Sequence, residues 1–111
     1  MRGPMPTERT PLLPISELPS GTMRCILVDG MPIGVAHAAG IIYAFADTCR
    51  HEGGSLSSGV LIDGTVTCPW HGWTYRLETG KAIVPPVGIR IPVYQTELVD
   101  GMIYAYVDWG E

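Results

Sequence analysis

Lysine is nearly absent from this sequence of 111 residues, which has one lysine beside six arginines and a formal net charge of −4 at pH 7. Such a chain has no basic patch that could bind phosphates. The composition therefore argues against DNA, RNA or an anionic membrane as a partner. It favours a protein partner with a basic docking face.

Long apolar runs are missing as well. The most apolar window, residues 33–46, includes His37 and two glycines, and it is shorter than the roughly 18 apolar residues that a membrane-spanning helix needs. The sequence starts with MRGPMPTERTPLLP, which contains four prolines but no apolar signal core and no paired arginines. We therefore expect a soluble, cytoplasmic protein whose residues 1–11 form a flexible tail.

Cysteine is also scarce. The three cysteines are an odd number in a short chain, and without a secretion signal they fit a reducing compartment. There they serve as metal ligands or as buried apolar residues rather than as disulfides. Cys25, in the β-prone stretch RCILV, is expected to be a core residue.

What the sequence does contain is a series of short β-prone runs separated by glycine turns, which predicts an all-β fold. The steps Asp63-Gly64 and Asp100-Gly101 each lie between two such runs and are strong hairpin signals. The stretch ISEL, residues 15–18, has room for a single helical turn. The length suits one domain, which we expect to span residues 12–111.

Two short motifs carry the chemistry. Cys49 and His51 stand two positions apart in CRHEGG, and Cys68 and His71 stand three apart in CPWHGWTY. Each motif follows a β-prone run, and the hairpin through Asp63-Gly64 joins them, so two loops can lie side by side. Two thiolates and two imidazoles are the four ligands that a closed metal site requires.

The spacing of these ligands bears on the choice of metal. Zinc sites of this composition group like ligands together, as Cys-x(2–4)-Cys and His-x(3–5)-His. Here each loop mixes one cysteine with one histidine. A [2Fe-2S] cluster with two histidines on one iron needs the same four residues, and the mixed spacing favours this cluster over zinc. His37 has no partner motif and is expected to be a strand residue without a ligand role.

The two motifs resemble those of the Rieske iron-sulfur family. CRHEGGSLSSG is similar to the first cluster loop of that family, CPWHGWTYRLETGKA to its second, and VPPVG, residues 84–88, to its proline loop. The resemblance implies an antiparallel β sandwich or barrel in which residues of about 47–76 form a small cluster-binding part. It also implies that Cys49 and Cys68 bind one iron, that His51 and His71 bind the other, and that Pro85 and Pro86 cover the cluster.

Four glycines near the motifs, Gly53, Gly54, Gly59 and Gly72, are expected to let the backbone approach the cluster.

The chain differs from the respiratory-complex branch of the family at several positions, and these differences indicate that it resembles a different branch. That branch has two cysteines, joined in a disulfide, where this chain has Gly54 and Trp70. It also has a serine hydroxyl that donates to a cluster sulfide where this chain has Trp73, whereas Tyr75 matches its tyrosine donor. Because donors to the sulfurs raise the reduction potential, we expect a value at the low end of the family range of roughly −150 to +300 mV.

The resemblance implies an electron carrier rather than an enzyme. Rieske oxygenases hold a second iron on two histidines and a carboxylate, and after the four ligands only His37 remains here. We expect a small ferredoxin that carries electrons from a flavin-dependent reductase to a terminal, aromatic-ring-hydroxylating oxygenase. Two alternatives stay open at this point: the small Rieske subunit of an assimilatory nitrite reductase, and a structural or interaction module stabilised by zinc.

The replacement Trp73→Ser tests the assignment of the missing donor. If the new hydroxyl reaches a sulfide, it stabilises the more negative reduced state, and the midpoint potential measured by voltammetry rises. A midpoint potential equal to that of the wild type would contradict the assignment.

Overall fold

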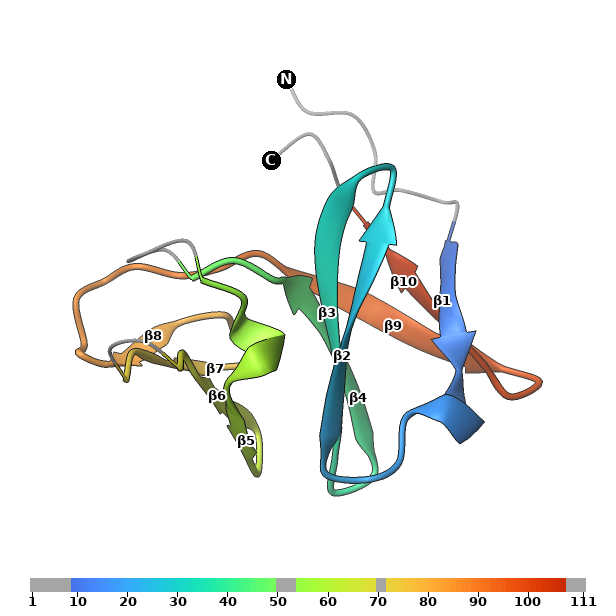
Figure 1. Ribbon diagram of the computed structural model, residues 1–111, viewed down its shortest axis with the longest axis horizontal. Helices are drawn as coiled ribbons and strands as arrows, with labels where there is room; N and C mark the ends of the chain where they lie inside the picture. The colour runs from blue at the N-terminus through green and yellow to red at the C-terminus, as the bar shows by residue number, and fades with distance from the viewer. Residues whose placement is uncertain (1–8, 50–53, 70–71, 108–111) are drawn as a thin grey trace.

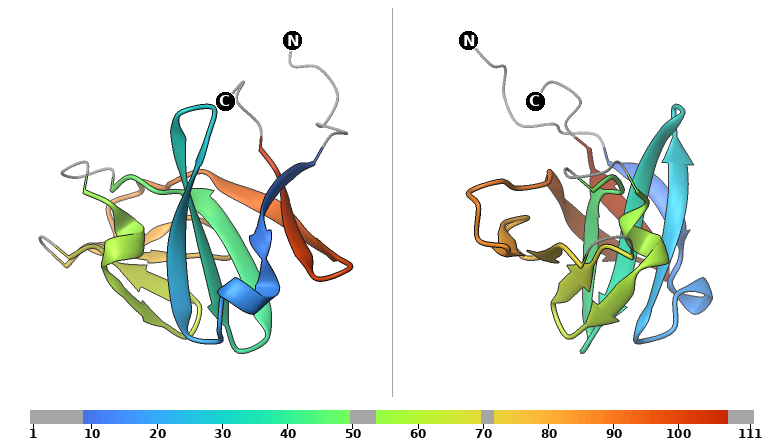
Figure 2. Two further views of the ribbon diagram at one scale, coloured as in Figure 1. Left: turned by 45° about the vertical axis from the view of Figure 1, so that its right-hand side comes forward. Right: turned by 60° about the vertical axis from the view of Figure 1, so that its left-hand side comes forward.

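The computed structural model describes residues 9–49, 54–69 and 72–107, which form two antiparallel β-sheets (Figure 1). The larger sheet has six strands in the order β1-β10-β9-β4-β3-β2. Its strands are β1 (Thr10–Pro14), β2 (Thr22–Val28), β3 (Met31–Ala38), β4 (Ile41–Ala46), β9 (Val93–Val99) and β10 (Met102–Tyr106). The two edge strands β1 and β2 contact each other, so the sheet is nearly closed (Figure 2). The prediction of an all-β fold is confirmed.

The smaller sheet is inserted between β4 and β9. Its strands, in the order β5-β6-β7-β8, are β5 (Val60–Ile62), β6 (Thr65–Thr67), β7 (Thr74–Arg76) and β8 (Ala82–Val84). Figure 1 shows this sheet at one side of the molecule, far from the β9–β10 turn. It includes β8, so it extends past residue 76, the expected end of the cluster-binding part.

Tight turns explain why several strands pair with the next strand in sequence. In the β2–β3, β3–β4 and β9–β10 turns both central residues have positive φ, at Asp29-Gly30 (51° and 79°), Ala39-Gly40 (53° and 82°) and Asp100-Gly101 (51° and 80°). This is the geometry of a type I′ turn, whose twist matches that of the strands. Asp63, with φ of 53°, turns β5 into β6. Both hairpins predicted from Asp-Gly steps are therefore confirmed.

Two short 3-10 helices interrupt the strands. η1 (Ile15–Glu17) follows β1 and matches the single turn expected there. η2 (Leu56–Ser58) lies between β4 and β5 and was not predicted. No helix in the described part of the chain is long and apolar enough to cross a membrane.

Strands β3 and β4 divide the interior into two cores because their side chains alternate between the two faces of the sheet. Val35 and Ala44 belong to a core inside the larger sheet, whereas Ala36 and Phe45 belong to a second core beneath the smaller sheet. Gly34 is paired with Phe45 across the two strands, and the phenyl ring occupies the space that a side chain at Gly34 would need. The second core also contains the two motif cysteines.

The start of the ordered domain differs from the expected boundary at residue 12. Thr10 and Pro11 are already paired with Ala105 and Tyr104 of β10. The Arg9 guanidinium lies 2.8 Å from Glu97 Oε1 and 4.4 Å from the centre of the Tyr104 ring. Thr10 and Pro11 therefore belong to β1, and the side chain of Arg9 contacts the neighbouring strands β9 and β10.

The turn between β7 and β8 ties the smaller sheet to the larger one. The N–H of Ile91, on the segment that leads into β9, donates to the Gly80 carbonyl over 2.8 Å. Gly80 has φ of 79°, and a Cβ there would overlap the Ile91 carbonyl. Only glycine fits this contact.

Replacing Gly80 with alanine therefore lowers stability for two reasons, and Gly101→Ala is the matched control. Gly101 has nearly the same φ, 80°, but has open space around its missing side chain. We expect Gly101→Ala to lower the free energy of unfolding by about 1 kcal/mol, and Gly80→Ala to lower it by about 1 to 3 kcal/mol more. Urea denaturation measures both values, and equal losses would contradict the proposed overlap.

Candidate metal centre

Cys49 lies at the start of the first motif loop, just beyond the end of β4. It is 2% exposed, and its N–H donates to the Gly54 carbonyl over 2.8 Å. This hydrogen bond closes the loop that carries His51 in sequence. Gly54 is itself buried, as suits a residue packed under a loop.

Cys68 begins the second motif loop, directly after β6. It is also 2% exposed. Its N–H donates to the Trp73 carbonyl over 2.7 Å, and its carbonyl accepts from the Gly72 N–H over 3.3 Å. Gly72 has φ of 75°, so the backbone turns back toward β7 at a position that favours glycine. The loop is thus a closed extension of the β6–β7 hairpin.

The fold brings both cysteines and Tyr75 into one buried core, although they come from three separate segments. Tyr75 is fully buried, and its hydroxyl lies 3.4 Å from Cys49 Sγ. When Cys49 is a thiolate, the hydroxyl must be the donor, because a thiolate has no proton to give. Two buried thiols, one of them beside a hydroxyl donor, fit the sulfur side of a [2Fe-2S] site.

Other predicted residues surround these three. Trp73 is partly buried against the same core, and its ring centre lies 6.5 Å from that of Tyr75, with the planes at 40°. Pro85 is half-buried and Pro86 is exposed; both follow β8, whose Val84 is paired with Thr74 beside the second loop. His51, Trp70 and His71 lie outside the described residues. Within the residues described, no three His, Cys, Asp or Glu side chains are grouped as a metal site would require.

One prediction made from sequence needs correction. Cys25 is exposed rather than in the core, because β2 is an edge strand that leaves one side of the residue open to solvent. Partial burial, together with a hydrogen bond and the negative charge of Asp47, raises the pKa of its thiol. At Gly59 the structure shows a separate need for glycine, since a Cβ there would overlap the Thr67 carbonyl of β6.

The remaining histidine among the described residues is His37, which lies in β3 as expected. Its Nδ1 is 2.8 Å from the Leu18 carbonyl. A carbonyl only accepts, so Nδ1 carries the proton. The side chain therefore holds the segment after η1 against β3.

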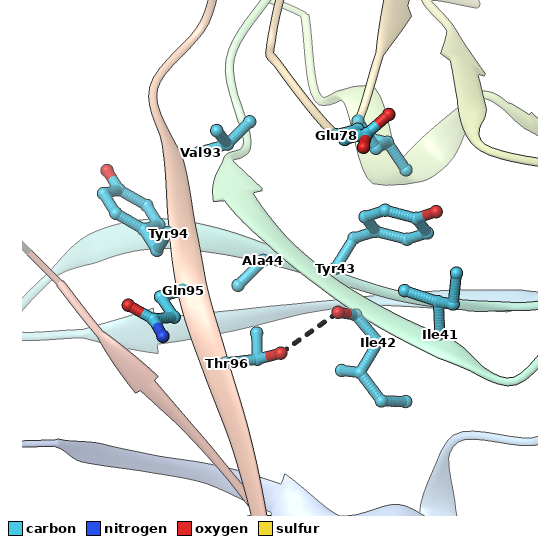
Figure 3. A pocket seen from close by; sticks show the side chains of 10 residues that line it. Ile41, Ile42, Tyr43, Ala44, Glu78, Val93, Tyr94, Gln95 and Thr96 are labelled. Atoms are coloured by element: carbon cyan, nitrogen blue, oxygen red, sulfur yellow. Dashed lines mark hydrogen bonds between the residues drawn. The ribbon is translucent and has the colours of Figure 1, made fainter.

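A surface pocket lies apart from these loops, where β4 and β9 separate (Figure 3). Tyr43 and Tyr94 line it, Glu78 stands at its rim, and Thr96 Oγ1 donates to the Ile42 carbonyl over 3.1 Å. Burial raises the pKa of the Tyr94 hydroxyl. None of the predicted site residues lines this pocket.

Comparison with known proteins identifies the class to which this fold and site belong. The model of the Rieske [2Fe-2S] domain family matches residues 8–95, which include both motifs. The chain belongs to this family. The predicted resemblance is therefore confirmed, and with it the expectation of one [2Fe-2S] cluster as the cofactor.

The similar proteins include several that are named as ferredoxins or ferredoxin subunits. Ferredoxin CarAc of Metapseudomonas resinovorans is 32% identical over 90 residues, which cover 80% of this chain and 84% of the relative. The 3-phenylpropionate/cinnamic acid dioxygenase ferredoxin subunit of Photorhabdus laumondii is 38% identical over 95 residues, which cover 84% and 89%.

A solved structure is similar over nearly the whole fold. It is a complex of reduced oxygenase and oxidized ferredoxin in carbazole 1,9a-dioxygenase, and one of its chains matches with a TM-score of 0.82 and 29% identity. The match covers 88% of this chain and 92% of that chain.

The contact between Tyr75 and Cys49 leads to a prediction for Tyr75→Phe. Removing the hydroxyl takes a donor from the sulfur, so the reduced state loses more stabilisation than the oxidised one. A hydrogen bond contributes about 0.5 to 1.5 kcal/mol, which for one electron corresponds to roughly 20 to 60 mV. We expect the midpoint potential to fall by this amount, as measured by voltammetry, while the control Tyr94→Phe leaves it unchanged. A potential that does not fall in Tyr75→Phe would show that the hydroxyl does not donate to this sulfur.

Proposed function

We propose that this chain is a one-electron carrier that delivers electrons through a Rieske [2Fe-2S] cluster to a terminal oxygenase, and that it is not itself an enzyme. The observation that carries the proposal is the burial of Cys49 and Cys68 in one core, with the Tyr75 hydroxyl against Cys49 Sγ. The relatives support it, because two of them are named as ferredoxins of dioxygenase systems.

The ligand set is part of the proposal. Cys49 and Cys68 would bind one iron through sulfur, and His51 and His71 would bind the other through ring nitrogen. When bound, such a cluster accepts and releases one electron at a time. The chain's own residues supply two thiolates shielded from water and a hydroxyl donor that stabilises negative charge on sulfur.

A docking surface beside the second loop is consistent with this role. Val84 and Val87 are 54% and 49% exposed, and Val84 is paired with Thr74, which follows that loop. Exposed apolar residues next to an electron-transfer centre suit a partner that binds briefly and leaves. The net charge of −4 adds long-range attraction to a partner with a basic face.

The electron donor and the compartment belong to the same proposal. A flavin-dependent ferredoxin reductase is the donor that we propose, because an electron carrier needs a source of single electrons. The cytoplasm is the compartment that we propose, since the three cysteines fit a reducing environment. A nitrite reductase partner is a weaker candidate, because the named relatives belong to dioxygenase systems. The family match sets aside the module stabilised by zinc.

Reconstitution tests the proposed function. The purified protein should contain equal amounts of iron and acid-labile sulfide, and it should restore product formation when added to a ferredoxin reductase and a Rieske dioxygenase that lack their own ferredoxin. The variant Cys68→Ser should lose the cluster and this activity together, whereas the control Asp100→Asn, in the exposed turn between β9 and β10, should keep both. Two results would contradict the proposal. One is a protein that contains zinc instead of iron. The other is a protein that carries the cluster but supports turnover by a nitrite reductase and not by an oxygenase.

A further inference from the structure

Asp47 is a buried carboxylate that the sequence motifs do not account for. It stands two residues before Cys49 and is 3% exposed. Among the described residues, Asp47 is the only charged residue that is buried. A buried carboxylate is costly unless hydrogen bonds replace the water that it loses, so its partners show what holds it there.

Two serines on the far side of the first loop supply three hydrogen bonds, and the Cys25 thiol is a further partner. Asp47 Oδ1 accepts the Ser57 N–H over 2.6 Å, and Oδ2 accepts the hydroxyls of Ser57 over 2.6 Å and of Ser55 over 2.7 Å. The two hydroxyls lie 3.1 Å from each other. Both serines come from η2 and the residue before it, so the carboxylate joins the end of β4 to η2.

We call the hydrogen bonds of Asp47 with Ser55 and Ser57 the Asp47 tie. This tie encloses the loop that presents Cys49. Inside it, the Cys49 N–H reaches the Gly54 carbonyl. Outside it, the Asp47 N–H donates to the Pro32 carbonyl of β3 over 3.1 Å, which fixes the aspartate to the larger sheet. The position of Cys49 therefore depends on a residue whose backbone is anchored to β3 and whose side chain is anchored to η2.

The same carboxylate places a buried negative charge on the segment that presents Cys49, two residues before it. With two ferric ions, two sulfides and two thiolates the oxidised site is neutral, and one added electron makes it negative. A fixed negative charge in a buried setting is weakly screened. It therefore disfavours the reduced state and lowers the reduction potential.

We propose that Asp47 is a positioning residue that closes the first cluster loop through Ser55 and Ser57, and that its negative charge keeps the reduction potential low. The inference rests on the proposed ligand role of Cys49. It assigns to a side chain that is not a ligand both the geometry of the loop and part of the electrostatic setting of the sulfur.

Asp47→Asn separates the charge from the geometry. The amide oxygen can still accept the Ser57 N–H, and the amide nitrogen can donate to the serine hydroxyls, because a hydroxyl is both donor and acceptor. We expect a higher midpoint potential in this variant, with at least a threefold higher ratio of reduced to oxidised protein at the wild-type midpoint. The control Asp100→Asn removes the same charge from the exposed β9–β10 turn, which lies across the molecule from the smaller sheet (Figure 1). Asparagine tolerates the positive φ at this position, so the ratio should stay unchanged.

Ser57→Ala tests the tie without removing the charge. It deletes one hydroxyl donor to Oδ2 but keeps the backbone N–H and the carboxylate. We expect the midpoint potential not to rise and the cluster to be lost to an iron chelator several times faster than from the wild type, as followed by visible absorbance. If Asp47→Asn does not fold, the double variant Ser55→Ala and Ser57→Ala is measured instead. In this variant the Asp47 carboxylate loses two hydroxyl donors that offset its negative charge, so the midpoint potential should fall.

The outcomes separate this inference from the proposed function. A wild-type protein with iron and sulfide, in which Asp47→Asn shifts the ratio no more than Asp100→Asn does, would overturn the role of the charge. An unchanged rate of cluster loss in Ser57→Ala would overturn the tie. A wild-type protein without iron would count against the proposed function. Thermal unfolding of the metal-free wild type and variants would then test the tie, which predicts a lower Tm for Ser57→Ala and an unchanged Tm for Asp100→Asn.

Discussion

The burial of two cysteine sulfurs in one apolar core is the constraint on which the rest of this structure depends. Cys49 and Cys68 are 19 positions apart in sequence, and both are 2% exposed. To meet, they need two loops that start from the same side of a rigid frame. The larger sheet provides the frame by fixing the end of β4, and the β6–β7 hairpin brings the second loop back against it. The tie between Gly80 and Ile91 then keeps the smaller sheet in place.

Around these sulfurs the chain balances opposing electrostatic effects. The Tyr75 hydroxyl offers a donor to Cys49 Sγ, which favours added negative charge. In the proposal made above, the buried carboxylate of Asp47 opposes this effect. A donor that stabilises the reduced state and a carboxylate that disfavours it let the chain adjust the reduction potential without changing the ligands.

Sequence reasoning reached the fold class, two hairpins and the two cysteines because each depends on a local signal. An Asp-Gly step specifies its own turn, and a Cys-x-His motif can be recognised in the sequence without knowing which other motif it meets in the fold. Asp47, Ser55 and Ser57 could not be found in this way, since their hydrogen bonds exist only after η2 folds back onto β4. The exposure of Cys25 was missed for a similar reason: RCILV gives no sign that β2 lies at the edge of its sheet. The pairing of Thr10 and Pro11 was not predicted either, because their partners on β10 lie more than 90 positions away in sequence.

The histidine ligands are the part of the site that depends most on the sequence motifs, and they are also what distinguishes a Rieske centre from a ferredoxin cluster held by four cysteines. Pulsed EPR of the reduced protein, labelled with ¹⁵N-histidine, tests them most directly. The account predicts a rhombic spectrum with a low average g and nitrogen couplings from two directly bound histidines. A spectrum without histidine couplings would contradict the assignment of His51 and His71.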